Sequence, residues 1–550
     1  MIAFRCLQCQ VALQVPDDWM GRKGLCPCCQ TRFVIPKKKP VFFARIFGNL
    51  PIATALPIIQ KNANDLVVTT TSRSDNLHPN CREIKTECAL ISSLNENHKY
   101  PRYATQFVSS VQERNCDIII GLDFGTSCTK VVIRSPYEHG GSAYPVPFYH
   151  VGNPGNPYLL PSVLWVDPNG NFSLTQVQGG SLYRDIKLNL VNNKPLYPIG
   201  KVSGHISPVP PDILAVGYIA LVLQETRQWF LRTHIERYGM LKLTWGMNIG
   251  IPSYSYDDEI LTKAYRKVAK VGWQLSIRPP LPSVQMAKKM LREIQGEHIG
   301  QNEATIEVIP EVIAEAIGYA RSQRRNEGLH ILVDVGASTV DMCSFLLRSD
   351  NGEDYYHILT ADVQPLGTVS LYRMLIDVLH KDYPQVADSL WTKLNPLNPF
   401  YNVQFPEEES SQIALNDARK EHQDQYRKMF GRLVIDLKTK RDPNSPKWIT
   451  GVPIFLCGGG KMMTEFKDYL SKSIVEIQSL YSRKGNLLLQ SLPSLYELPN
   501  TITDGYRDRL AVAWGLSYPE HDIGEVERPS EISDIPPRRV IERKEEPWER

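Results

Sequence analysis

The stretch GLDFGTSCTK, residues 121–130, follows the apolar run at residues 118–120, which Asp117 precedes, and gathers small, polar and cationic residues in one tight turn. The apolar run predicts a buried strand, and Gly121 and Gly125 permit the turn that follows. Successive backbone amides of such a turn point at an anion, so the stretch is typical of a phosphate-binding loop. Asp123 would repel a phosphate unless Mg²⁺ with its water shell lay between them. The further donors of this turn are Thr126, Ser127, Thr129 and Lys130.

Two later stretches have the same form, an apolar run that enters a glycine turn. LHILVDVGAST at residues 329–339 carries the acid Asp334, and Asp341 follows it; CGGG at residues 457–460 has no acid. Two acid-bearing turns that face each other would hold a polyphosphate between two carboxylates directed at Mg²⁺. The third turn suits a flat, uncharged group such as a nucleoside. The three turns together therefore predict a nucleotide site.

The chain is long enough for two or more domains. Its 550 residues have an ordinary globular composition, with 42% hydrophobic and 22% charged residues. From residue 116 to residue 518, strands that end in glycine turns alternate with amphipathic helices, which predicts an α/β domain. Residues 41–115 lack a sustained period and are expected to form a partly disordered linker. Residues 519–550 are proline-rich and charged, and we expect a flexible tail there.

Four cysteines near the start form two CxxC pairs, CLQC and CPCC, within residues 1–40. This spacing predicts a tetrahedral zinc site in a small zinc ribbon, where the metal would supply most of the folding free energy. A redox-active CxxC pair is the alternative. Basic residues around the ribbon leave contact with nucleic acid open, although such ribbons more often bind protein or are structural. The expected zinc ligands are Cys6, Cys9, Cys26 and Cys29.

Charge and hydropathy argue against a membrane protein. The net charge of +3 implies no strong attraction to nucleic acid or to a membrane surface. The most apolar stretch, which starts at Phe42, contains Arg45, Asn49 and two prolines and is a poor membrane span. No apolar signal segment begins the sequence, and paired CxxC thiols suit a reducing compartment, so we expect a cytoplasmic protein.

Five motifs in a fixed order resemble those of the actin, hexokinase and heat-shock chaperone ATPase superfamily. IIIGLDFGTSCTKVVI, IPEVIAEAIGYA, ILVDVGASTVDMCSF, IFLCGGGKMMTEFKDYL and RLAVAWGLS are similar to its phosphate 1, connect 1, phosphate 2, adenosine and connect 2 motifs. The DnaK-type nucleotide-binding domain is the nearest in pattern. The resemblance covers residues 116–518 and implies two RNase-H-like lobes around a nucleotide cleft, the actin-like ATPase fold. It implies ATP or ADP and Mg²⁺ as ligands.

The resemblance also implies roles for individual residues. Asp123 and Asp334 would orient the Mg²⁺ waters, and Lys187, in YRDIKLNL, would contact the γ-phosphate and the attacking water. Glu311 would help to position that water. A solvated surface lysine and a helix N-terminal acid after Pro310 are the alternative interpretations of Lys187 and Glu311. The residues expected around the phosphates and the adenosine are Gly125, Thr126, Ser127, Lys130, Gly336, Ala337, Ser338, Thr339, Gly458, Gly459 and Gly460.

Several residues depart from the family pattern. Ala337 and Ser338 stand where the family usually has glycines, which would make the backbone approach tighter or the chemistry slower. Met462 stands where chaperones usually stack an arginine on adenine, and Arg509 where connect 2 often has an acid. Adenine specificity is therefore implied by the resemblance and not by these residues. The few residues after residue 518 are charged and do not resemble the peptide-binding domain of a chaperone.

The resemblance implies a chaperone-like ATPase switch that hydrolyses ATP and acts on a protein partner without the usual peptide-binding domain. One alternative is an actin-like ATPase whose protomers assemble into filaments. Another is a nucleotide sensor that does not hydrolyse ATP and has the zinc ribbon as its effector. A small-molecule kinase would need a carboxylate base beside a sugar pocket, and no residue can be named for that role.

Overall fold

In the computed structural model the chain divides into two units. The described residues are 2–5, 12–15, 23–25, 32–34, 58–61, 66–69, 115–137, 142–151, 156–199, 207–239, 241–277, 282–294, 304–393, 405, 407–480, 486–493, 495, 497–499, 502 and 504–535. The first unit comprises residues 1–101, 109–111 and 231–239. The second comprises residues 102–108, 112–230 and 240–550.

The first unit contains one six-stranded sheet with the order β1-β2-β5-β6-β3-β4. Two of its strands, β5 and β6, fall in the stretch expected to be a linker. It also contains the short helix α5 (Ile235–Tyr238). Its strands are β1 (Ile2–Arg5), β2 (Ala12–Val15), β3 (Lys23–Leu25), β4 (Arg32–Val34), β5 (Ile58–Lys61) and β6 (Leu66–Thr69).

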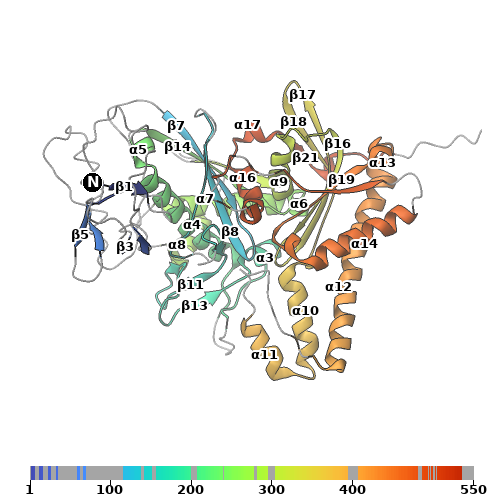
Figure 1. Cartoon of the computed structure of the whole chain (residues 1–550), viewed down its shortest axis with the longest axis horizontal. Coiled ribbons are helices and arrows are strands. Elements are labelled where there is room, and N and C mark those ends of the chain that lie inside the picture. The colour runs from blue at the N-terminus through green and yellow to red at the C-terminus, as the bar shows by residue number, and fades with distance from the viewer. Residues whose placement is uncertain are drawn as a thin grey trace, which may run out of the picture. The chain divides into compact units, whose positions relative to one another are not determined.

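The second unit is mixed α/β and contains two larger sheets with related strand orders (Figure 1). In the first, β7 pairs antiparallel with β8 and β8 with β9, while β14 and β15 continue the sheet as parallel strands on the other side of β7. The short strand β10 also pairs with β8. The strands of this sheet are β7 (Asn115–Asp123), β8 (Cys128–Ser135), β9 (Ser142–Pro145), β10 (Leu160–Pro161), β14 (Lys242–Ile251) and β15 (Thr305–Pro310).

The second of these sheets repeats that order. β16 pairs antiparallel with β17 and β17 with β18, and the parallel strands β19 and β20 lie on the other side of β16. β21 adds a parallel strand beyond β18. Its strands are β16 (Gly328–Val335), β17 (Val340–Asp350), β18 (Glu353–Gln364), β19 (Val452–Cys457), β20 (Leu487–Gln490) and β21 (Glu525–Glu527). A separate three-stranded sheet contains β11 (Leu164–Val166), β12 (Phe172–Ser173) and β13 (Ser181–Tyr183).

Helices cover the sheets, and several begin at side-chain caps that the sequence supplies. Asp258 accepts hydrogen bonds from the amides of Ile260 and Leu261 at the start of α7, and Ser283 accepts one from Met286 at the start of α8. The helices of the second unit are α3 (Ile186–Val191), α4 (Pro211–Thr233, which runs into the first unit), α6 (Ser253–Tyr256), α7 (Glu259–Ser276), α8 (Val284–Glu293), α9 (Glu311–Ala320), α10 (Thr368–His380), α11 (Pro384–Lys393), α12 (Glu409–Asp436), α13 (Lys447–Thr450), α14 (Thr464–Leu480), α15 (Asp504–Arg507), α16 (Ala511–Leu516) and α17 (Glu520–Ile523).

Both faces of β16 are buried, and alternate residues enter different cores. Leu329, Ile331 and Val333 join a cluster with side chains of α10, α12 and α14, which lie on one side of this sheet (Figure 1). Leu332 joins a second cluster with side chains of α9 and α16. Val132 of β8 belongs to the same cluster, so it connects the two larger sheets. A strand buried on both faces explains the nearly continuous apolar run in its sequence.

The second cluster depends on a very close approach between α9 and α16. A Cβ atom added to Gly515 of α16 would lie 1.8 Å from the carbonyl oxygen of Ala314 in α9. On the opposite side of α16, a Cβ added to Gly121 of β7 would lie 2.1 Å from the carbonyl oxygen of Ala513. Real Cβ atoms do not occur at such distances. Glycine at both positions therefore lets α16 contact a helix and a strand at the same time.

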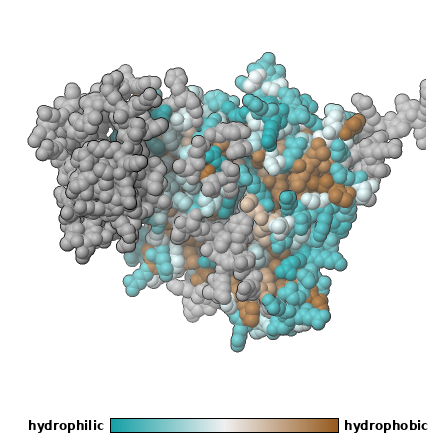
Figure 2. All heavy atoms as spheres, in the orientation of Figure 1, coloured by the Kyte–Doolittle hydropathy of each residue, from teal (hydrophilic) through white to brown (hydrophobic). Residues whose placement is uncertain are grey.

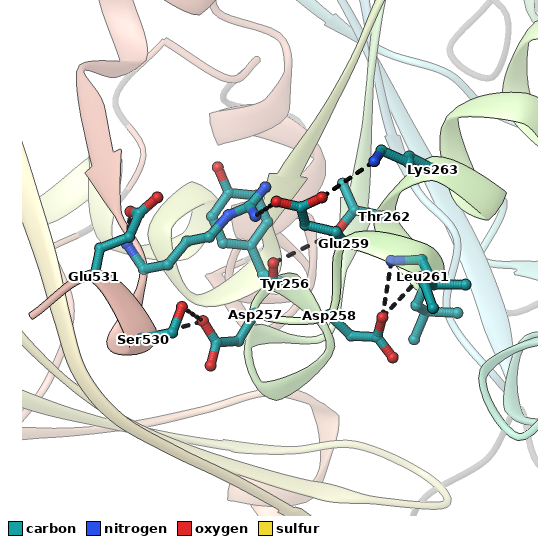
Figure 3. A network of polar contacts seen from close by, with 11 residues as sticks. Tyr256, Asp257, Asp258, Glu259, Leu261, Thr262, Lys263, Ser530 and Glu531 are labelled. Carbon is teal, nitrogen blue, oxygen red and sulfur yellow. Dashed lines mark hydrogen bonds and ion pairs between the residues drawn. The ribbon is translucent and has the colours of Figure 1, made fainter. Parts of the chain in front are cut away.

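The C-terminal segment 520–535, expected to be part of a flexible tail, forms α17, β21 and the 3₁₀ turn η5 (Pro529–Glu531). β21 pairs with the edge of β18, and Ile523 is buried. At η5, the amide and hydroxyl of Ser530 both donate to Oδ1 of Asp257, which follows α6 (Figure 3). Specific partners for this charged segment, which its composition does not reveal, account for the difference from the expectation.

On the other side of the C-terminal segment, Arg441 forms hydrogen bonds with the residues that follow β21. Its guanidinium donates to the carbonyl oxygens of Pro529 at 2.6 Å and Ile532 at 3.0 Å, and also to that of Leu359 in β18. The segment thus has partners next to β18 on one side and beside α6 and α7 on the other.

No helix in the described part of the chain combines the length and apolar character needed to cross a bilayer. The visible surface of the second unit is mostly hydrophilic, with a few apolar areas (Figure 2).

We expect Gly515→Ala to lower the free energy of unfolding by about 3 kcal/mol or more, because its methyl group would overlap the backbone of α9. Gly431→Ala in α12 is the matched control, since an added Cβ there would meet no atom within 4 Å. Replacing that glycine should stabilise the helix by about 0.5–1 kcal/mol. Urea denaturation of both variants measures the difference, and equal effects would contradict the close packing of α16.

Candidate functional site

A cleft in the second unit collects turns from both larger sheets. Its walls come from the β7–β8 turn, the β16–β17 turn and the turn after β19, together with α3, α9 and the residues before α16. The space between these walls, including the part open to solvent, is about 810 Å³. The predicted site residues that line it are Asp123, Gly125, Thr126, Ser127, Lys130, Lys187, Glu311, Asp334, Gly336, Ala337, Thr339, Gly458, Gly459 and Gly460.

The β7–β8 turn is tight and places an ion pair in the cleft. Asp123 and Lys130 are paired residues at the ends of the two strands, and Lys130 Nζ lies 2.7 Å from Asp123 Oδ2. A Cβ added to Gly125 would lie 2.3 Å from the carbonyl oxygen of Cys128. Glycine is therefore needed for the chain to turn back so sharply. The half-buried Thr126 and Ser127 lie at the tip of the turn and line the cleft.

The β16–β17 turn is braced by the start of α10. The amide of Gly336 donates to the carbonyl of Thr339 at 2.9 Å, and the amide of Val369 donates to the carbonyl of Ala337 at 2.7 Å. Ser338 was expected to contact phosphate, but it is buried and does not line the cleft. Its carbonyl oxygen accepts a hydrogen bond from Ser370 Oγ, so this turn is held towards α10 at that residue.

The turn after β19 lies directly against the acid of the second turn. Gly458 has φ of 77°, and a Cβ added to it would lie 1.9 Å from Asp334 Oδ1. No other residue type could occupy this position without displacing the carboxylate. The glycine run therefore serves two purposes here, since it permits the left-handed backbone and leaves room for Asp334.

Lys187 and Glu311 meet in the cleft although they are far apart in the sequence. Lys187 Nζ lies 2.5 Å from Glu311 Oε1, and the two side chains are only 7% and 13% exposed. These exposures exclude the alternative interpretation of Lys187 as a solvated surface lysine. Glu311 is the first residue of α9, so the helix dipole also favours its charge. Burial nevertheless raises the pKa of Glu311, and the nearby charge of Lys187 opposes that rise.

Two more acids in the cleft carry oxygens without a partner among the described residues. Burial, and then the charge of Glu311, raises the pKa of Asp334 to about 6. Glu315 is 4% exposed, and burial followed by the charge of Asp334 raises its pKa well above the usual range. Asp334 Oδ1 and Glu315 Oε2 are buried and unpaired. Unpaired buried carboxylate oxygens are costly, so this region of the cleft fits a bound cation.

Three further residues, Glu315, Asp508 and Thr368, line the cleft although they were not predicted from the sequence. Glu315 lies four residues after Glu311, which puts both acids on one face of α9, and this spacing was a usable signal. Asp508 pairs with Lys461 Nζ. Thr368 begins α10 after a turn that carries no phosphate-loop pattern.

The charges that line the cleft are unequal. Five carboxylates, those of Asp123, Glu311, Glu315, Asp334 and Asp508, face three cations, those of Lys130, Lys187 and Arg509. Within the described residues, no group of three or more His, Cys, Asp or Glu side chains could hold a metal ion by itself. A divalent ion here would therefore need water or ligand oxygens to complete its shell, as Mg²⁺ usually does. The expected zinc ligands Cys6, Cys9, Cys26 and Cys29 lie outside the described residues.

Asp341, the residue paired with Asp334 across the hairpin, connects the two larger sheets. Its Oδ2 accepts a hydrogen bond at 2.9 Å from the amide of Ser253, which follows β14 of the first of these sheets. Burial raises the pKa of Asp341 to about 7; the Ser253 bond opposes this, and the charges of Asp334 and Glu311 add to it.

A group whose folded pKa exceeds its unfolded value binds more protons in the folded state. Asp341 therefore makes the protein less stable as the pH rises from about 4, near the unfolded pKa, to about 7. We expect Asp341→Asn to stabilise the protein by on the order of 2 kcal/mol more at pH 8 than at pH 5. Urea denaturation at both pH values measures this, with the exposed Glu293→Gln as the control. An effect that does not depend on pH would contradict the raised pKa.

Comparison with known proteins identifies no relative: no family model matches the chain, and no curated protein is significantly similar to it in sequence.

Proposed function

We propose that the cleft binds Mg²⁺ with ATP and that the chain is a chaperone-like ATPase switch. The observation that carries the proposal is the convergence of three separate strand-to-turn segments on one cleft, at residues 124–127, 336–339 and 458–460. Two of these turns follow acids, and the third follows none. This is the arrangement that the sequence predicts for a polyphosphate next to a nucleoside.

The strand orders support the same proposal. In each larger sheet of the second unit, three consecutive antiparallel strands are followed by two parallel strands on the far side of the first. An RNase-H-like lobe has this order, and a pair of such lobes would form the actin-like ATPase fold. We therefore extend the proposal to two RNase-H-like lobes with the cleft between them.

The side chains suit the hydrolysis of a terminal phosphate. Asp123 and Asp334 would accept hydrogen bonds from metal-bound waters, and the unpaired Asp334 Oδ1 fits that role. Bound Mg²⁺ would neutralise the negative charge on the phosphates. Lys187 would hold the γ-phosphate, and Glu311, already bonded to Lys187, would orient a water in line with the bond to be broken. The water oxygen would form a bond to the γ-phosphorus as the bond between that phosphorus and the β–γ bridging oxygen breaks; ADP would leave with the bridging oxygen, and the proton of the water would pass to the released phosphate.

A switch of this type needs a difference in affinity between two arrangements of the lobes. ATP with its γ-phosphate would favour the arrangement in which both acid-bearing turns reach it, and ADP would favour it less. A protein partner would then sense the change. Zinc bound by the N-terminal cysteines and a cytoplasmic location remain part of the proposal.

The test measures MgATP binding by calorimetry and phosphate release in the purified full chain. We expect the wild type to bind MgATP and to release phosphate slowly, and Lys187→Met to lower the rate about 100-fold or more. Lys289→Met is the matched control, because Lys289 also pairs with a glutamate, Glu293, but on an exposed helix surface. It should leave the rate unchanged.

The possible results separate the competing functions. The absence of any heat with saturating MgATP would overturn the proposal. Binding without phosphate release would favour the nucleotide sensor, and pelleting of the chain with ATP analogues would favour the filament former. Turnover that survives Lys187→Met would remove Lys187 from the reaction.

A further inference from the structure

Arg509 lies between two of the turns that form the cleft. It belongs to the 3₁₀ turn η4 (Asp508–Leu510), directly before α16, and its side chain is half-buried. Its Nη2 donates a hydrogen bond to Cys128 Sγ, at 3.2 Å, at the end of the β7–β8 turn. Its Nε and Nη2 each lie 3.4 Å from the position that a Cβ on Gly459 would take. The guanidinium therefore touches the first turn and the third.

The other cations in and around the cleft are already paired with carboxylates. Lys130 pairs with Asp123, Lys187 with Glu311, and Lys461 with Asp508. Asp508, the acid next to Arg509 in sequence, is thus engaged with Lys461. Within the described part of the chain Arg509 makes no ion pair, and its polar partner is the Cys128 sulfur, a weak acceptor.

Such a guanidinium has most of its hydrogen-bonding capacity left for a ligand. Its planar set of donors matches the oxygens of a phosphate in a two-point contact, which a lysine cannot reproduce. Burial lowers the pKa of Lys130 and the charge of Asp123 raises it, with a net rise that the nearby positive charge of Arg509 opposes. An anion between the two cations would relieve this repulsion.

We infer that Arg509 binds a phosphate of the nucleotide close to the nucleoside and makes the site selective for nucleoside di- and triphosphates over the free nucleoside. This inference rests on the proposed function. Lys187 and Glu311 lie at the proposed γ-phosphate position, whereas Arg509 lies next to Gly459 in the turn assigned to the nucleoside. Arg509 would thus contact a phosphate that both ADP and ATP carry.

The experiment compares the dissociation constants of adenosine, MgADP and MgATP for the full chain by calorimetry. Arg509→Met keeps most of the side-chain length and removes the charge. We expect this variant to raise the dissociation constants of MgADP and MgATP about 10- to 100-fold and to change that of adenosine less than about twofold. Arg509→Lys should fall between the wild type and Arg509→Met for both phosphorylated ligands, because it keeps the charge but loses the two-point contact.

The control is Arg427→Met, since Arg427 pairs with Glu476 on the exposed surface of α12 and lies outside the cleft. It should leave all three constants unchanged. Thermal unfolding midpoints identify any variant that does not fold, and Arg509→Lys then carries the comparison alone.

Three other results would contradict either the role of Arg509 or the proposed function. If Arg509→Met raised the dissociation constants of adenosine and MgADP by the same factor, Arg509 would contact the nucleoside, and the inference would be overturned. Unchanged constants in both Arg509 variants would show that the residue only joins the two turns through Cys128. A wild type that binds none of the three ligands would instead defeat the proposed function, whatever the Arg509 variants do.

Discussion

The arrangement of the second unit depends on the contact between two helices that have no room for a single extra methyl group. At Gly515 the backbone of α16 comes so near to Ala314 of α9 that any side chain would overlap its carbonyl. The same helix lies equally near to Gly121 in β7. Each of these three elements has a charged cleft residue at or next to one of its ends. Asp123 ends β7, Glu311 begins α9, and Arg509 lies just before α16. The spacing of these charges is therefore set by backbone contact.

The cleft shows the electrostatic cost of bringing these groups together. Burial raises the pKa of Asp334 and Glu315, and each acid also feels the negative charge of another. Lys130 and Lys187 oppose the rise in the pKa of Asp334, and Lys461 opposes that of Glu315, but the pKa of both acids stays raised. Acids with strongly shifted pKa values cluster at functional sites. In this cleft acids outnumber cations, and Asp334 Oδ1 and Glu315 Oε2 have no partner among the described residues.

The sequence predicted the parts of the site that are encoded locally and missed those that depend on the folded arrangement. The glycine turns were found because a strand followed by glycine is a local pattern, and Lys187 was found through a short motif. Glu315 was missed because the connect 1 resemblance assigns a role only to Glu311, the first acid of this helix. Ser338 was placed in the cleft by its motif, but it is buried, and its carbonyl oxygen accepts a hydrogen bond from Ser370 of α10. The segment 520–535 has the composition of a free tail, and only pairing with β18 reveals its structure.

That C-terminal segment has a mechanical consequence. It is bonded to β18 and Arg441 on one side and to Asp257, beyond β14 of the neighbouring sheet, on the other. A rotation that separated the two sheets would pull η5 between Asp257 on one side and Arg441 on the other. The bonds to Asp257 are exposed to water, whereas the Arg441 side chain is only 12% exposed. The bonds to Asp257 would therefore break before those to Arg441, so η5 would stay with β18 while its contact beside α6 is lost.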